Sequence, residues 1–138
     1  MNYEEKILIG GRALVALGSS RMTSDTDYLV FDEASKEAFI RDEENNVDYL
    51  NAASNDFFFH IWEVEKGREM ASPQSLLELK AYACVQHCQN FNFQKADDCE
   101  YDMRFLARKF KLTGFNIVQE YITAGQLKEI QKTVFKDL

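Results

Sequence analysis

The sequence predicts an α/β domain in which a small mixed sheet packs on helices and a helical portion follows. Only one proline and six glycines occur in 138 residues, which leaves too few turns for a sandwich or a barrel. Before Pro73, short apolar runs alternate with glycines and acidic stretches, whereas after it apolar residues recur at helical spacing. We therefore expect one domain over residues 1–138, with a sheet-bearing half (1–71) and a helical half (72–138).

The first half contains four runs that are typical of strands. The apolar run KILIG comes first, and glycines and the helix former RALVAL follow it. The run DTDYLVF is rich in β-formers, and two shorter runs flank DEENN, which favours a hairpin turn. These observations predict strands at 6–10, 25–31, 37–41 and 47–51, with a helix at 12–17 between the first two.

The aromatic segment 55–66 fits a strand or a helix, and we favour a helix because Phe58, Ile61 and Trp62 share a helical face. After it, Ser72 is a good N-cap and Pro73 suits the first position of a helix. The helical spacing of the second half predicts helices at 73–89, 96–110, 115–123 and 125–137, with glycines near the last two breaks.

Composition and charge exclude several classes of function. Hydrophobic residues make up 46% and aromatic residues 13%, as in a globular protein. The 23 acidic residues outnumber the 16 basic ones, so we expect no duplex DNA partner, and any nucleic-acid contact has to be local. No apolar run approaches the roughly 18 residues of a membrane span, and MNYEEK does not resemble a secretory signal. We expect a cytoplasmic protein with no membrane partner.

Paired carboxylates at Asp25 and Asp27 are the first candidate site. Side chains alternate along a strand, so these two should project on the same side and repel each other unless they share a proton or bind a hard cation such as Mg²⁺. Upstream, a turn at Gly18 and Ser19 can present N–H groups and a hydroxyl to phosphate oxygens. Together they indicate metal-assisted phosphoryl or nucleotidyl transfer, and the alternative is a solvated acidic strand end.

Two motifs carry a resemblance to a known family. Leu17-Gly18-Ser19 followed by Asp25-Thr26-Asp27 resembles the sequence motif of the nucleotidyltransferase superfamily that includes DNA polymerase beta. The runs GGRAL (10–14) and RMTSDTD (21–27) are similar to the AbiEii-like branch of abortive-infection and toxin–antitoxin nucleotidyltransferases. Thr26 departs from the apolar residue usual between the aspartates, and the length is nearer that of the minimal nucleotidyltransferases.

The resemblance also implies roles for single residues. Asp25, Asp27 and Asp48 would hold Mg²⁺ or Mn²⁺, and Asp48, in the run VDYL, would also activate the acceptor. Lys80 lies in a Ser-Pro-x-x-Leu-Leu-x-x-Lys helix start and would face the nucleotide phosphates, with Asp102 near it on an adjacent helix. The nucleotide-binding residues implied in this way are Gly18, Ser19, Arg21, Lys80 and Asp102.

Each of the charged residues also has a plainer interpretation. Arg21 can be a solvated loop arginine, Lys80 a lysine that extends along apolar surface to water, and Asp102 an acid on a helix surface. A strand aspartate with apolar neighbours, as at Asp48, is costly to bury and has the stronger case for function.

Cysteine and histidine residues in the second half raise the question of a zinc site. The candidates are Cys84, His87, Cys88 and Cys99, of which the first three can share a helical face. The spacing lacks a C-x-x-C knuckle, so we interpret the cysteines as free thiols.

The function expected from these observations is Mg²⁺-dependent nucleotidyl transfer. A nucleoside monophosphate would move from a nucleoside triphosphate such as ATP to a hydroxyl of RNA, for example a tRNA 3′ end, or of a protein. The resemblance suggests a toxin–antitoxin or phage-defence context, with a partner protein or a homodimer. The alternative is a catalytically inactive protein of the same fold that acts as a nucleotide-binding or protein-interaction module.

Overall fold

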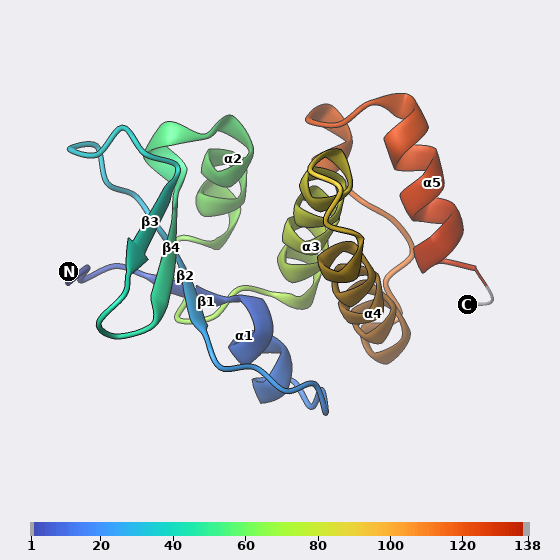
Figure 1. Ribbon diagram of the computed structural model, residues 1–138, viewed down its shortest axis with the longest axis horizontal. Helices are drawn as coiled ribbons and strands as arrows, with labels where there is room; N and C mark the ends of the chain where they lie inside the picture. The colour runs from blue at the N-terminus through green and yellow to red at the C-terminus, as the bar shows by residue number, and fades with distance from the viewer. Residues whose placement is uncertain (1, 137–138) are drawn as a thin grey trace. The chain divides into compact units, whose positions relative to one another are not determined.

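The computed structural model describes residues 2–136 and has the expected mixed α/β class (Figure 1). The chain divides into two compact units, residues 1–72 and 73–138. The first unit contains a four-stranded mixed sheet, and the second is helical. Among the residues described, no helix is long and apolar enough to cross a membrane.

The sheet of the first unit has the strand order β1-β2-β4-β3. The two central strands, β2 and β4, run parallel, while β1 pairs with β2 and β3 with β4 in antiparallel fashion. The chain segment that follows the last helix of this unit returns beside β1, where Leu8 pairs with Met70. The strands are β1 (Ile7–Ile9), β2 (Thr26–Val30), β3 (Phe39–Asp42) and β4 (Val47–Asn51).

The predicted strand at 25–31 is one residue too long at each end. β2 begins at Thr26, so Asp25 lies in the loop directly before the strand and Asp27 lies within it. The physical reason is pairing: β1 ends at Ile9 opposite Asp27, and β4 begins at Val47 opposite Thr26. Neither neighbouring strand offers a residue to pair with Asp25, so the ladder stops there.

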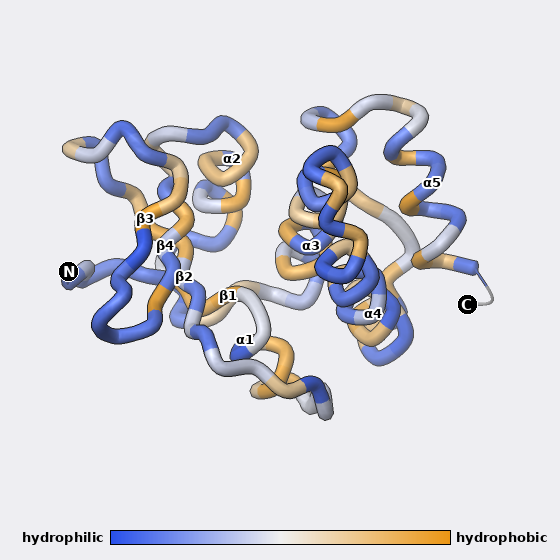
Figure 2. Tube along the Cα trace, viewed as in Figure 1, coloured by the Kyte–Doolittle hydropathy of each residue, from blue (hydrophilic) through white to orange (hydrophobic). Residues whose placement is uncertain are grey.

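The predicted hairpin between the two short strands is confirmed. β3 and β4 pair around a turn at 43–46, in which Asn46 has a left-handed φ of 57°. The Asp42 carboxylate accepts hydrogen bonds from the side chain (3.0 Å) and backbone N–H (3.3 Å) of Asn45. The side-chain bond is the main reason that the pKa of Asp42 lies below its usual value. This turn is a hydrophilic stretch of the chain (Figure 2).

Two α-helices complete the first unit: α1 (Gly10–Ala16) and α2 (Asp56–Glu65). The second confirms the helix favoured for the aromatic segment. Asn55 caps it by accepting the Phe58 N–H at 2.9 Å, and Phe57, Phe58, Ile61 and Trp62 are buried along one side. A short 3₁₀ turn, η1 (Ala52–Ser54), precedes α2. The apolar spacing of the segment therefore decided its structure more than its aromatic content did.

The second unit contains three α-helices in its described part. The predicted helix at 73–89 is confirmed in full, whereas the next one begins three residues earlier than predicted because Asn92 caps it. The last helix has a capping box formed by Thr123 and Gln126. It ends at Val134, and the predicted end at Asp137 lies outside the described residues. The helices are α3 (Pro73–Gln89), α4 (Phe93–Phe110) and α5 (Ala124–Val134).

The predicted helix at 115–123 is wrong. Only a 3₁₀ turn, η2 (Val118–Glu120), forms there. Glu78 on α3 is fully buried and accepts the backbone N–H groups of Asn116 (2.6 Å), Ile117 (3.2 Å) and Val118 (2.9 Å). One carboxylate thus satisfies three N–H donors of this segment, and it holds the segment as a loop against α3.

Candidate active site in the sheet-bearing unit

Asp27 and Asp48 lie side by side in the centre of the sheet. They are register partners on the parallel strands β2 and β4, so their side chains project from the same face. Arg41 on β3 is in turn the register partner of Asp48. The three charged residues form one row across adjacent strands, and each is partly exposed to solvent. Asp27 and Asp48 therefore form a pair of carboxylates on one face of the sheet.

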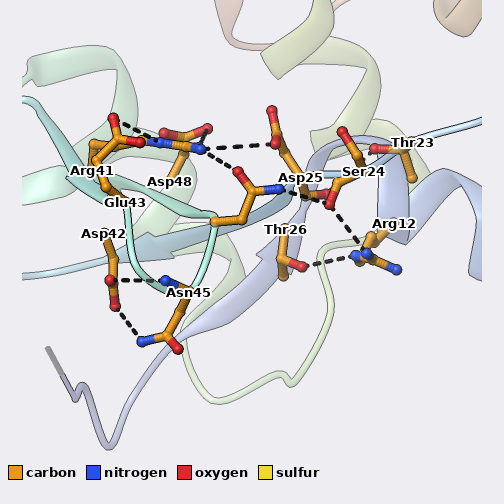
Figure 3. A network of polar contacts seen from close by, with 11 residues as sticks. Arg12, Thr23, Ser24, Asp25, Thr26, Arg41, Asp42, Glu43, Asn45 and Asp48 are labelled. Carbon is orange, nitrogen blue, oxygen red and sulfur yellow. Dashed lines mark hydrogen bonds and ion pairs between the residues drawn. The ribbon is translucent and has the colours of Figure 1, made fainter.

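Arg41 connects two of the predicted carboxylates. Its Nη1 lies 2.9 Å from Asp48 Oδ2, and its Nη2 lies 4.0 Å from Asp25 Oδ1 (Figure 3). Nε is also 3.5 Å from Glu43 Oε1, and the guanidinium donates a hydrogen bond to Asn46. The hydrogen bond to Asp48 is the largest cause of the raised pKa of Arg41. No motif in the sequence marks this arginine, because only the register of the hairpin sets it opposite Asp48.

Gly10 lies directly against Asp27. It has a φ of +70°, and a Cβ built on it would lie 2.1 Å from Asp27 Oδ2. A glycine is required here for both reasons, since an L side chain would be strained and would clash with the carboxylate. Of the two glycine turns, the one at the junction of β1 and α1 is therefore the one that contacts an aspartate. From the sequence, this turn was predicted only as the start of a helix.

The Gly18-Ser19 turn lies at the other end of the same helix. The N–H groups of Gly18 and Ser19 donate to the carbonyls of Val15 and Leu14, each at 3.0 Å, and so they close the C-terminal end of α1. Ser19 Oγ is buried and accepts the Arg21 N–H at 3.2 Å. The seven residues of α1 span about 10 Å along the helix axis. The Gly18-Ser19 turn therefore lies at the far end of α1 from Gly10, the glycine that contacts Asp27.

Two arginines lie near the start of α1. A Cβ at Gly11 would lie 2.8 Å from Arg21 Nη1 and 2.7 Å from Thr23 Oγ1, so the Arg21 side chain returns to the glycine turn. The exposed Arg12 donates from Nε to Thr26 Oγ1 at 2.8 Å, one residue before Asp27. Arg12 was not among the residues that the sequence singled out, although it follows the two glycines directly. Positive charge therefore lies at the same end of α1 as the Asp27 carboxylate.

The arrangement can be compared with what Mg²⁺ requires. This ion is usually bound by one or two carboxylates, with waters and substrate phosphates completing an octahedron. Asp27 and Asp48 supply two neighbouring carboxylates of this kind, so the chemistry of the donor set fits. Asp25 is turned toward Arg41 and is 48% exposed. Within residues 2–136, no three histidine, cysteine or acidic side chains are already arranged around a metal position.

Lys80 and Asp102 belong to the helical unit, where they form an ion pair across α3 and α4. Lys80 Nζ lies 3.0 Å from Asp102 Oδ2, and the two side chains are 15% and 0% exposed. The two residues are therefore close to each other, as expected. Asp102 is buried and is not an acid on a helix surface, and the Lys80 ammonium contacts a carboxylate and does not extend to water.

The cysteines of the helical unit are free thiols. Cys84 and Cys99 are buried, whereas Cys88 is exposed. Burial, with smaller contributions from Cys88 and Cys99, raises the pKa of the Cys84 thiol to about 12. His87 is half-buried, and its pKa is lowered first by burial and then by Lys95 and Lys80.

A comparison of the chain with protein-family models, with curated proteins and with solved structures finds no match.

Proposed function

We propose that the sheet-bearing unit is a Mg²⁺- or Mn²⁺-dependent nucleotidyltransferase that moves a nucleoside monophosphate from a nucleoside triphosphate to an acceptor hydroxyl. The single observation that carries the proposal is the Asp27–Asp48 pair on adjacent parallel strands, with Gly10 pressed against Asp27. Two carboxylates in this position are the ligands that a divalent cation shared with a triphosphate prefers. The acceptor is a hydroxyl of RNA or of a protein.

Each residue of the site has a defined part in this reaction. Asp27 and Asp48 would hold the cation, which neutralises phosphate charge and orients the triphosphate. Asp48 accepts the proton of the acceptor hydroxyl, whose oxygen forms the new bond to the α-phosphorus as the bond to pyrophosphate breaks. Gly10 allows the Asp27 carboxylate to approach the main chain closely, and Arg12 and Arg21 offset the negative charge of the phosphates.

Arg41 favours a second candidate function. It already provides a cation 2.9 Å from Asp48, as an ion pair would in a site that no longer needs a metal. On this hypothesis the protein binds nucleotide or a partner protein without turnover. The two candidates differ in one measurable property, which is transfer of label from the nucleotide to an acceptor.

The decisive experiment uses the full chain with Mg²⁺, each of four α-³²P-labelled nucleoside triphosphates, and RNA or protein acceptors. Asp27→Asn removes one carboxylate charge of the pair, and Glu44→Gln makes the same chemical change at an exposed turn position. Label transfer that is lost in Asp27→Asn and kept in Glu44→Gln supports the enzyme. Thermal stabilisation by nucleotide without transfer to any acceptor would instead establish the binding module.

A further inference from the structure

The exposed side of α4 carries a run of cations and aromatic rings, in contrast to the acidic character of the chain. Residues 1–72 contain 7 basic and 15 acidic residues, whereas residues 73–138 contain 9 and 8. Within the segment 104–111 there are four basic residues and no acidic one. We call the following set the α4 basic face: Tyr101, Arg104, Phe105, Arg108, Lys109 and Lys111.

The α4 basic face lines two adjoining depressions on the surface of the helical unit. Each has a volume of about 440 Å³, and Arg108 lines both. Tyr101 and Phe105 line one together with cations, and Phe135 lines the other. Among residues 2–136, no carboxylate lines the two depressions, whereas Glu100 and Glu129 line the larger depression beside Cys88.

Helical spacing keeps these side chains together and leaves them accessible. Positions 101, 104, 105 and 108 follow one side of α4, opposite the side that buries Met103 and Leu106. Tyr101 is 56% exposed, and Arg108 and Lys109 are exposed as well. Since the apolar side of α4 is already used in the core, insertion of this helix into a membrane surface is not an explanation for its cations.

Local contacts position the cations beside the rings. Arg104 Nη1 donates to the Thr133 carbonyl at 3.1 Å, which ties the guanidinium to the last turn of α5. Lys109 Nζ lies 5.7 Å from the centre of the Phe105 ring and 5.8 Å from that of Phe110. Proteins bind single-stranded nucleic acids through two features: cations along the path of the phosphate backbone, and aromatic rings on which the bases stack.

We propose that the α4 basic face binds single-stranded RNA. Arg108, Lys109 and Lys111 contact phosphates, and bases stack on Tyr101 and Phe105. A single strand offers phosphates to the cations and bases to the rings, whereas a duplex would need a broader basic surface than four cations provide. An acidic protein is the competing occupant that the test below separates. The role of the bound strand as the acceptor rests on the proposed function, but the binding itself does not.

Fluorescence anisotropy with a labelled single-stranded RNA, without metal or nucleoside triphosphate, tests the proposal. The variant Arg108→Gln/Lys109→Gln should weaken binding and make the slope of log affinity against log salt less negative by about 1.4. Tyr101→Ala should weaken binding by about fivefold or more and leave that slope unchanged. Lys95→Gln/Lys128→Gln removes the same charge from exposed positions away from the face and should bind like wild type.

Three results would overturn the proposal. The first is no saturable RNA binding at low salt, and the second is an equal loss of RNA binding in the Lys95→Gln/Lys128→Gln control. The third is competition by polyglutamate as strong as that by unlabelled RNA, together with unchanged RNA binding in Tyr101→Ala. The last would identify an acidic protein as the partner. Since these assays contain no metal or nucleotide, absence of label transfer alone would contradict the proposed function and not RNA binding.

Discussion

Gly10 and Asp27 lie so close together that the carboxylate of Asp27 occupies the place of a side chain at position 10. The distance from an ideal Cβ to Asp27 Oδ2 is 2.1 Å, and the backbone φ of +70° adds strain for any L residue. Gly10→Ala should therefore displace Asp27 and abolish label transfer. The loss of stability should exceed the roughly 1–2 kcal/mol of a left-handed alanine alone.

Gly67→Ala is the matched control for that prediction. Gly67 has a φ of +91°, and no atom lies within 4 Å of its Cβ position, so the variant measures backbone strain without a clash. Urea unfolding of both variants gives the two costs. If Gly10→Ala were no less stable than Gly67→Ala and kept full transfer, the close approach to Asp27 would be irrelevant to the site.

The Lys80–Asp102 pair should contribute to stability through its burial. Lys80→Met leaves the fully buried Asp102 without its ammonium and should lower the free energy of unfolding by about 3–5 kcal/mol. Adding Asp102→Leu should restore most of the loss, because the buried charge is then gone. Lys66→Met, which breaks the exposed pair with Glu63 at 3.1 Å, should cost less than about 1 kcal/mol. Equal costs for Lys80→Met and Lys66→Met would contradict this account.

Glu78 should hold the loop at 114–118 in place. Glu78→Gln replaces an acceptor-only group by an amide, whose NH₂ cannot accept the N–H groups of Asn116, Ile117 and Val118. We expect a loss of about 1–3 kcal/mol and faster hydrogen exchange at these three amides. Glu129→Gln, at an exposed position on α5, is the control. Unchanged exchange in Glu78→Gln would show that the loop is held by other contacts.

His87 should make stability depend on pH. Its pKa is lowered in the folded state, first by burial and then by Lys95 and Lys80, so the unfolded chain takes up the proton first as pH falls. The free energy of unfolding should therefore decline below about pH 6.5, the unperturbed pKa of histidine, and the decline continues down to the folded-state pKa. The wild type should lose more stability between pH 7.5 and pH 5 than His87→Gln does in urea unfolding. The same decline in both proteins would refute the role of His87.

Local signals in the sequence were sufficient for most elements. The spacing of apolar residues in α2 and α3, the turn residues at 43–46 and the β-formers of β2 each act over a few neighbouring residues. The segment at 115–123 failed for the opposite reason. Its backbone N–H groups at 116–118 bind the carboxylate of Glu78, which lies about 40 positions earlier in the chain.

The sequence alone predicted the α/β class, most of the helices and strands, and the candidate carboxylates Asp25, Asp27 and Asp48. Tertiary structure decided which groups meet: strand register sets Asp48 between Asp27 and Arg41, and the end of β1 brings Gly10 against Asp27 while leaving Asp25 outside the sheet. The physical reason is that periodicity fixes the face on which a side chain lies. The partner across that face depends on pairing between strands that are far apart in the chain.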